Sequence, residues 1–286
     1  MKLIRHGSPG KESPGVILKN GDLIDVTKLG QDYNEEFFAT DGLARLGKWL
    51  GVHASTAPKL SMDVRLGPPI CRPSKIVCIG LNYADHAKEG GMEIPTEPIL
   101  FFKSTTSLIG PNDNVMIPKG ATKVDWEVEL AVIIGKRASY ISSNEADKHI
   151  AGYALFNDYS ERSFQLERGG QWVKGKSCDT FSPLGPYLAT GVEIGDPNHL
   201  DLWLKVNDVL KQKSNTSNFI FKVYDVISYI SQFMTLLPGD IISTGTPAGV
   251  GLGFDPPQYL NAGDVVELGI EKLGTSKQVI KAYSPT

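Results

Sequence analysis

The chain has 286 residues, of which 41% are hydrophobic and 21% charged, and its formal net charge is -3 at pH 7. This composition is typical of a globular protein with a sizeable core and excludes a disordered chain. The small net charge, without long basic runs, gives no electrostatic footprint for nucleic acid or an anionic membrane surface. We therefore expect a small-molecule partner, with neither a nucleic acid nor a membrane as partner.

The cysteines, Cys71, Cys78 and Cys178, include no C-x-x-C pair. They predict neither a disulfide framework nor a thiolate zinc site, and they fit a reducing compartment. The first residues lack the apolar stretch of a signal peptide, and no later apolar run approaches a membrane span. These features predict a cytoplasmic protein.

The N-terminal part is predicted to begin with a β-hairpin, because two apolar runs, Val16 to Leu18 and Leu23 to Val26, flank the turn pair Asn20-Gly21. A helix through Leu43, Leu46, Trp49 and Leu50 is expected next. The proline-rich stretch from Gly67 to Pro73 then marks a boundary. We predict a small N-terminal domain over residues 1–70 and a catalytic domain over residues 71–286.

The longer unit is predicted to be rich in strands. Strand-like runs occur at Ile76–Ile79, Ile99–Phe102, Glu127–Ile134, Leu202–Val206 and Val265–Ile270. One helix is expected to bury Val223, Val226, Ile227, Ile230 and Phe233 and to end before Pro238-Gly239. A shorter helix is expected near Ser142, with Glu145 completing a capping box. Strands and long helices do not alternate regularly, so a doubly wound parallel sheet is not expected.

The segment Asp125 to Leu130 alternates acidic and apolar residues, which places its carboxylates on one face of a strand. A solvated outer face is one interpretation. The apolar run Ala131 to Ile134 favours another, in which the strand enters the core and a bound cation compensates Glu127 and Glu129.

A second apolar run, Tyr153 to Phe156, ends at Asn157-Asp158. Asp158 would supply a third carboxylate ligand. Sites made only of carboxylates select hard cations, so Mg²⁺ or Mn²⁺ is the expected metal.

His86 and Glu89 are three residues apart and would face each other on a helical turn. A carboxylate-oriented histidine is a usual general base, whereas the alternative is an ordinary surface ion pair. Gly90 and Gly91 follow directly and would let the segment move as a lid.

Three further positions have plain surface interpretations when taken singly. Lys176 follows a glycine in a polar stretch, and Arg162 and Gln165 stand four and seven residues beyond Asp158, where helical spacing would align them with that carboxylate. The glycine-rich loop from Gly245 to Gly251 follows a strand but lacks the spacing of a nucleotide-binding loop. It would instead offer backbone N–H groups and Thr246 to a carboxylate.

Five segments together resemble the fumarylacetoacetate hydrolase family in order and spacing, across most of residues 71 to 270. They are Asn82–Glu89, Asp125–Leu130, Asn157–Arg162, Gly175–Ser177 and Gly245–Gly251. The resemblance implies a mixed, β-rich α+β fold, a β-roll of packed sheets that is usually found in a homodimer. The chain is much shorter at its N-terminus than fumarylacetoacetase itself, which makes that particular substrate unexpected.

The resemblance also implies roles for individual residues. Glu127, Glu129 and Asp158 correspond to metal ligands, and His86 with Glu89 to a water-activating dyad on a lid. Lys176 corresponds to the group that stabilises an oxyanion. The positions that correspond to substrate-orienting groups are Arg162, Gln165 and Thr246.

The stretch Gln165 to Trp172 is similar to a bacterial branch described either as 2,4-diketo-3-deoxy-L-fuconate hydrolase or as ureidoglycolate lyase. The favoured hypothesis is a metal-dependent hydrolase that cleaves a C–C bond in a 2,4-diketo acid of the acylpyruvate type. On the fuconate derivative, a sugar acid, it would give pyruvate and lactate. Alternatives on the same scaffold are a lyase, an oxaloacetate decarboxylase and an oxo-acid isomerase. A non-catalytic metal-binding module would leave His86, Glu89 and Lys176 unexplained.

Overall fold

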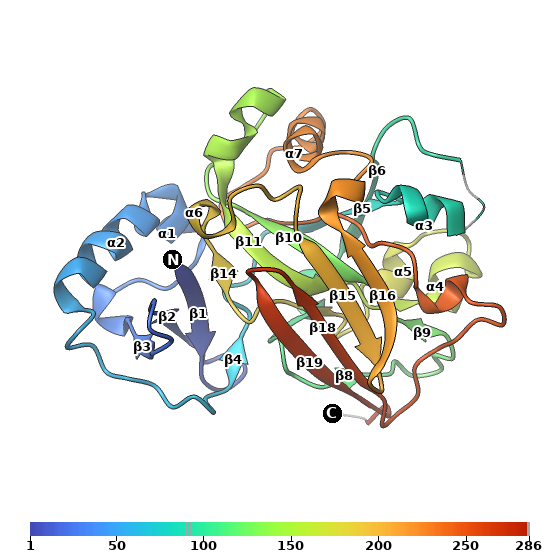
Figure 1. Ribbon diagram of the computed structural model, residues 1–286, viewed down its shortest axis with the longest axis horizontal. Coiled ribbons are helices and arrows are strands. Elements are labelled where there is room, and N and C mark those ends of the chain that lie inside the picture. The colour runs from blue at the N-terminus through green and yellow to red at the C-terminus, as the bar shows by residue number, and fades with distance from the viewer. Residues whose placement is uncertain (90, 92, 285–286) are drawn as a thin grey trace.

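A large, mainly antiparallel sheet runs through the computed structural model, which describes residues 1–89, 91 and 93–284 (Figure 1). Its strand order is β3-β2-β1-β14-β11-β10-β17-β5-β6, with β4 paired to β1, and only the β17–β5 pairing is parallel among these neighbours. The strands are β1 (Lys2–His6), β2 (Ser13–Ile17), β3 (Leu23–Asp25), β4 (Leu66–Gly67), β5 (Ile76–Gly80), β6 (Ile99–Lys103), β10 (Val128–Ile134), β11 (Ile150–Asn157), β14 (Leu188–Ala189) and β17 (Ile241–Ser243).

A second sheet packs against the middle of the first and lies in front of β10 and β11 in Figure 1. Its order is β16-β15-β18-β19-β8, formed by β8 (Val115–Met116), β15 (Asp201–Val206), β16 (Val209–Asn215), β18 (Val265–Ile270) and β19 (Gly274–Lys281). Two short pairs complete the strands, β9 (Val124–Asp125) with β12 (Ser160–Glu161) and β7 (Leu108–Ile109) with β13 (Ser182–Pro183). Packed sheets with short helices form the mixed α+β fold that the sequence predicts.

The helices are short and lie around the sheets. They are α1 (Glu35–Ala39), α2 (Gly42–His53), α3 (Ala84–Glu89), α4 (Arg162–Leu166), α5 (Val173–Lys176), α6 (Gly191–Ile194) and α7 (Val223–Ser231). Single 3₁₀ turns are η1 (Thr27–Leu29), η2 (Thr105–Ser107), η4 (Thr216–Asn218) and η5 (Gly251–Gly253), and η3 (Ser143–His149) is longer. None of the helices in the described part of the chain is both long and apolar enough to cross a membrane.

Strand β10 is the centre of the core because both of its faces are buried. Leu130 and Val132 face the cluster shared with the second sheet, whereas Ala131 and Ile133 face a cluster shared with the N-terminal helices. All seven residues of the strand are buried. The predicted entry of this segment into the core is therefore confirmed.

Most of the predicted elements are present. The hairpin forms from β2 and β3, and Gly21 adopts the positive φ of 91° that its turn requires. The predicted N-terminal helix is α2, and the segment after Ser142 has the expected capping box but is a 3₁₀ helix. The predicted strand Glu127–Ile134 is present as β10 but begins one residue later, at Val128, and Trp126 and Glu127 separate it from β9, which ends at Asp125.

The helix predicted to bury Phe233 ends earlier. Helix α7 stops at Ser231, and Phe233 is 63% exposed beyond it. The other expected positions of its apolar face, Val223, Val226, Ile227 and Ile230, are buried as predicted. The helix thus has the predicted face but is shorter at its C-terminus.

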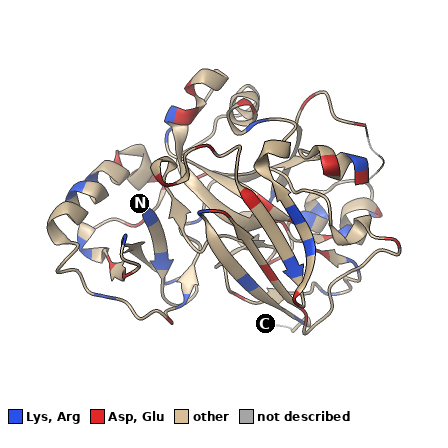
Figure 2. Cartoon of the chain, in the orientation of Figure 1, with Lys and Arg blue, Asp and Glu red and all other residues tan. Residues whose placement is uncertain are grey.

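The boundary near residue 70 stays a prediction. Strands from both sides of it join the large sheet, since β1 pairs with β14 through Leu3 and Leu188. Figure 2 shows basic and acidic residues interspersed over the elements of both parts. In this view, neither part is distinguished from the other by a single sign of charge.

Strands β11 and β14 pack closely at Gly152, and this packing predicts how a substitution there changes stability. A Cβ atom at Gly152 would overlap the carbonyl oxygen of Ala189, so we expect Gly152→Ala to destabilise the protein by about 1–3 kcal/mol. Gly47→Ala is the matched control, because Gly47 lies in α2 with no atom within 4 Å of an added Cβ, and it should be neutral or stabilising by up to about 1 kcal/mol. Denaturant unfolding measures both, and equal stabilities of the two variants would contradict the close packing at Gly152.

Candidate functional site

A cavity of about 480 Å³ opens between β5, β6, α3, α4, α5 and the loop that follows β17. Its size lies within the range of sites for small molecules. Every predicted site residue except Asp158 lines it: His86, Glu89, Glu127, Glu129, Arg162, Gln165, Lys176 and Thr246. Residues that are up to 160 positions apart in the sequence are therefore brought to one cavity.

Glu127, Glu129 and Asp158 form a buried carboxylate cluster at the base of this cavity. One oxygen from each lies within 4.8 Å of the others, so the three side chains could hold a metal ion. Glu127 precedes β10, Glu129 is its second residue and Asp158 directly follows β11. The register of the β10–β11 pair holds the three together, since Val128 is opposite Asn157 and the Asp158 amide donates to the Glu127 carbonyl at 2.9 Å.

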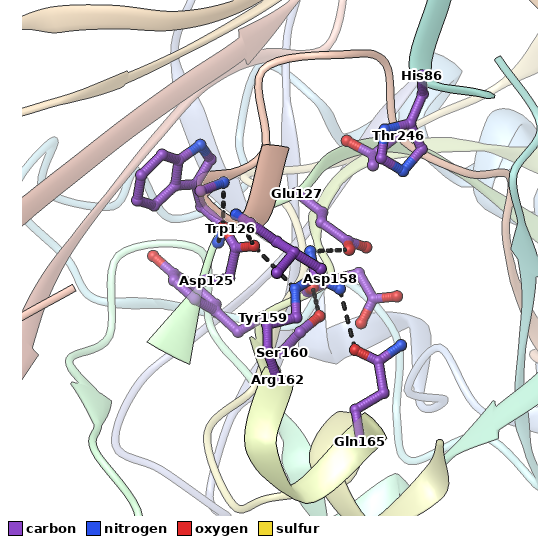
Figure 3. A network of polar contacts seen from close by, with 12 residues as sticks. His86, Asp125, Trp126, Glu127, Asp158, Tyr159, Ser160, Arg162, Gln165 and Thr246 are labelled. Carbon is purple, nitrogen blue, oxygen red and sulfur yellow. Dashed lines mark hydrogen bonds and ion pairs between the residues drawn. The ribbon is translucent and has the colours of Figure 1, made fainter. Parts of the chain in front are cut away.

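The predicted helical alignment of Asp158 with Arg162 and Gln165 is wrong. Asp158 lies in the connection between β11 and β12, and helix α4 begins only at Arg162. The Arg162 guanidinium therefore contacts other carboxylates, Asp125 at 2.8 Å and Glu127 at 2.7 Å (Figure 3). Gln165 does share a helix with Arg162 and accepts a 3.0 Å hydrogen bond from Nη1.

Two buried lysines complete the ion pairs of the cluster. Lys176 Nζ lies 2.7 Å from Glu127 Oε2 and 2.8 Å from Asp158 Oδ2. Lys103 Nζ lies 2.6 Å from Asp158 Oδ1 and donates to the Tyr159 carbonyl. The surface interpretation of Lys176 is thereby excluded, because only 2% of this residue is exposed.

These cations keep Glu127 ionised in a buried position. Burial by itself would raise the pKa of Glu127, but the charges of Lys176 and Arg162 outweigh it and lower the pKa to about 2. The ordinary value is 4.5, so the ionised group stabilises the fold above that pH. This stabilisation is lost as the pH falls from about 4.5 through about 2.

Glu129 differs, because among the described residues no cationic side chain forms an ion pair with it. Its Oε2 accepts hydrogen bonds from Ser243 Oγ and from the Gly245 amide instead. Burial, together with the negative charges of Asp158 and Glu127, holds the pKa of Glu129 well above its ordinary value. A divalent cation would supply the missing positive charge, so the donor set fits a hard metal ion.

His86 and Glu89 lie on α3, as predicted, with His86 Nδ1 3.2 Å from Glu89 Oε2. Glu89 Oε1 also accepts a 2.9 Å hydrogen bond from the Gly249 amide, which ties α3 to the loop after β17. Of the two glycines predicted to let this segment move, Gly91 has a φ of 61° and Gly90 lies outside the described residues. The lid itself stays a prediction.

The loop after β17 donates its backbone N–H groups to carboxylates of the chain itself. Gly245, Gly249 and Gly251 contact Glu129, Glu89 and Asp125, respectively. The Thr246 hydroxyl donates to the Val128 carbonyl at 3.0 Å and accepts from Gln212 Nε2 at 2.8 Å. In this state Thr246 has only acceptor capacity left at its hydroxyl for a substrate.

Sequence reasoning missed several residues that shape the site. Lys103 ends the apolar strand β6, and a lysine directly after such a run is a weak signal for a buried cation. Asp125 belongs to the acidic segment, but no local pattern indicates that it pairs with Arg162. Gln212, which is fully buried and bridges Val128 to Thr246, lies on β16 and gave no local signal.

Comparison with known proteins gives a consistent result. Residues 75–281 match the family model described as Fumarylacetoacetate (FAA) hydrolase C-terminal. A curated protein of Burkholderia multivorans, whose name specifies no substrate, is 48% identical over 283 residues, or 99% of each chain.

Two solved structures are similar over the whole chain. Fumarylacetoacetate hydrolase from Exiguobacterium antarcticum is 35% identical with a TM-score of 0.87, covering 99% of this chain and 100% of that one. Maleylpyruvate hydrolase from Sphingobium sp. SYK-6, solved in complex with manganese(II) ion and pyruvate, is 29% identical with a TM-score of 0.81 and the same coverage.

The electrostatics of the cluster predict a pH-dependent metal affinity. Because the pKa of Glu129 is raised and a cation needs its ionised form, Mg²⁺ binding should release protons and strengthen with rising pH. Calorimetry in two buffers of different ionisation enthalpy measures the released protons. Glu129→Gln should abolish binding, whereas Glu145→Gln, at an exposed capping box, should not change it. An affinity that is constant between about pH 5 and 8 would contradict the linkage.

Proposed function

The chain belongs to the fumarylacetoacetate hydrolase family, and from this membership we propose that it is a divalent-metal-dependent hydrolase that cleaves a C–C bond in a 2,4-diketo acid. The observation that supports this proposal best is the shared cavity. It joins a carboxylate cluster suited to a cation with a histidine that a carboxylate orients. Taken alone, the carboxylate cluster could be a structural ion-pair network and the His86–Glu89 pair an ordinary ion pair. Together they match the two requirements of this hydrolysis, a Lewis-acid cation and a base.

The proposed cation is Mg²⁺ or Mn²⁺, held by Glu127, Glu129 and Asp158. When bound, such an ion supplies Lewis-acid polarisation of a 2-oxo acid. The relative from Sphingobium was solved in complex with manganese(II) ion and pyruvate, which supports a divalent metal and an oxo-acid ligand for this chain. A small oxo acid is thus the proposed partner, and a homodimer is the proposed assembly on family resemblance.

His86 is proposed as the base that activates water. Because Nδ1 faces Glu89 at 3.2 Å, the carboxylate favours a proton on that nitrogen and leaves Nε2 free to accept one. Glu89 is itself held by the Gly249 amide, so the pair keeps its orientation against the loop. Water gives a proton to Nε2 and its oxygen adds to C4. The C3–C4 bond then breaks, and its electron pair remains on C3 until the proton that Nε2 took from water is returned there.

Lys176 is proposed to stabilise the negative charge that develops on oxygen. Its ammonium already lies between Glu127 and Asp158 in a buried position, so it needs no reorganisation to act there. Arg162 and Gln165 line the cavity as a hydrogen-bonded pair and are proposed to orient the substrate. The products are pyruvate and the acid derived from the acyl group, which would be lactate for 2,4-diketo-3-deoxy-L-fuconate.

A substitution tests the base. His86→Ala should lower kcat by about 10²–10⁴-fold, because general base catalysis by a positioned side chain contributes that much. Metal binding should stay nearly unchanged, since His86 is not among the cluster carboxylates. His199→Ala, at an exposed histidine outside the cavity, is the control. Unaltered turnover in His86→Ala would assign the base to another group.

Pyruvate release tests the reaction itself. A panel of 2,4-diketo acids that includes 2,4-diketo-3-deoxy-L-fuconate is assayed with Mg²⁺ or Mn²⁺ and again after chelation. The proposal predicts chelator-sensitive release of pyruvate and its absence in Glu129→Gln. Release that survives chelation would exclude the metal-dependent mechanism. No pyruvate from any diketo acid, with turnover of oxaloacetate, ureidoglycolate or an unsaturated oxo acid, would favour a decarboxylase, lyase or isomerase.

A further inference from the structure

The cavity has two chemically different parts. The polar part is formed by Glu127 and Glu129 of the cluster, by Arg162 and Lys176, and by the His86–Glu89 pair, and large apolar side chains form much of the remainder. The apolar lining includes Leu81, Phe101, Leu166, Trp172 and Leu252. Neither the ion pairs of the cluster nor the His86–Glu89 pair uses these side chains, so they are available to the part of the substrate that does not react.

Phe101 and Trp172 form a built aromatic wall. Their rings meet edge to face, with centroids 5.4 Å apart, and Lys176 Nζ lies 5.0 Å above the Phe101 ring. The backbone accommodates the indole, because a Cβ atom at Gly80 would lie only 2.9 Å from the Trp172 ring. Phe101 therefore joins this wall to Lys176, and Trp172 extends the wall beyond Phe101.

Two leucines carry the apolar surface to the mouth of the cavity. Leu166, at the end of α4, is 46% exposed, and Leu252, in η5, is 39% exposed. Both line the cavity although water reaches them. An apolar group of a ligand would remove this surface from water, which favours its binding.

In the described lining the basic residues all belong to the polar part, at the reacting end, so none is left for a second carboxylate at the far end of the substrate. The positively charged or titratable basic residues there are His86, Arg162 and Lys176, and each already contacts a carboxylate of the chain. Of the residues near α3 that the structure does not describe, Gly90 and Met92 carry no charge by sequence. Arg168, two residues beyond Leu166 in the sequence, is not part of the lining, and its guanidinium stacks on the Phe164 ring.

From this division we infer, on the basis of the proposed function, that the acyl group beyond C4 of the substrate is uncharged and ends in hydrocarbon. The substrate class is then a monocarboxylic 2,4-diketo acid with an alkyl or aryl end. A second carboxylate at that end would lose water against Trp172, Leu166 and Leu252 without gaining a cation, which is unfavourable. Maleylpyruvate, the substrate in the name of the Sphingobium relative, ends in such a carboxylate.

A matched pair of substrates tests the inference. The acids 2,4-dioxoheptanoate and 2,4-dioxoheptanedioate have the same chain length and differ in a terminal methyl against a carboxylate. We expect kcat/KM for the methyl-ended acid to be at least about tenfold higher, and to rise about fourfold with each methylene from 2,4-dioxopentanoate onward. Equal or better use of the dioate would overturn the inference while leaving the proposed hydrolase intact.

A substitution at Leu166 tests whether the apolar lining causes the preference for the methyl-ended acid. Leu166→Arg should lower the ratio of the two kcat/KM values by about fivefold, because it offers a partly exposed cation to the distal carboxylate. Val173→Arg is the control, because Val173 is 43% exposed on the neighbouring helix α5 but does not line the cavity. An unchanged ratio in Leu166→Arg, or an equal change in the control, would overturn the assignment.

Binding of unreactive 2-oxo acids tests the inference even if the protein does not hydrolyse diketo acids. Calorimetry with Mg²⁺ present compares 2-oxohexanoate with 2-oxohexanedioate, which cannot undergo the hydrolysis. Tighter binding of the monoacid, by at least about tenfold, supports an apolar distal site whatever the reaction is. Equal or tighter binding of the diacid would overturn it. Absence of pyruvate from every diketo acid together with tighter monoacid binding would reject the proposed function alone.

Discussion

The structure of the site depends on how the charges of four buried carboxylates are compensated. Asp125 and Glu127 share Arg162, and Glu127 and Asp158 share Lys176, with Lys103 as a further partner of Asp158. Within the described part of the chain, three cations thus face four acids, and Glu129 accepts hydrogen bonds from Ser243 and Gly245 without an ion pair. A carboxylate charge that is buried without a cation is costly. The ion pairs that compensate the other three carboxylates therefore leave a site at Glu129 that a divalent ion would fit.

The central strand explains why these acids are buried at all. Strand β10 has the large sheet on both sides and apolar clusters on both faces, so the residues at its first positions are buried, and the cavity opens beside them. Glu129 lies at this end of the strand, and Glu127 immediately precedes it. The loop after β17 covers the same end and supplies amide donors to Glu129 and Glu89. The core therefore positions the candidate metal ligands, and the loop ties them to the proposed base on α3.

Local patterns predicted much of this arrangement. Alternation along Asp125 to Leu130 and the apolar run behind it indicated a strand that enters the core, and the spacing of His86 and Glu89 indicated their contact. The same kind of reasoning failed where the chain stays extended instead of forming a helix. Asp158 and Arg162 have helical spacing, but β12 separates them, and Arg162 turns to Asp125 and Glu127 instead. Spacing within one element is local information, whereas the partner of a buried charge depends on which elements pack together.

The sequence by itself determined the mixed α+β class, the early hairpin, the strands β5, β6, β10, β15 and β18, the family resemblance and the residue types at the cavity. It could do so because periodicity and short motifs act over a few neighbouring residues. Only the tertiary structure decided that Lys103 and Lys176 are buried counter-ions, that Gln212 bridges Val128 to Thr246, and that Phe101, Trp172 and Leu166 line one cavity with the carboxylates. These contacts join residues far apart in the chain. Burial and charge compensation arise when sheets and loops pack, so a local sequence pattern cannot predict them.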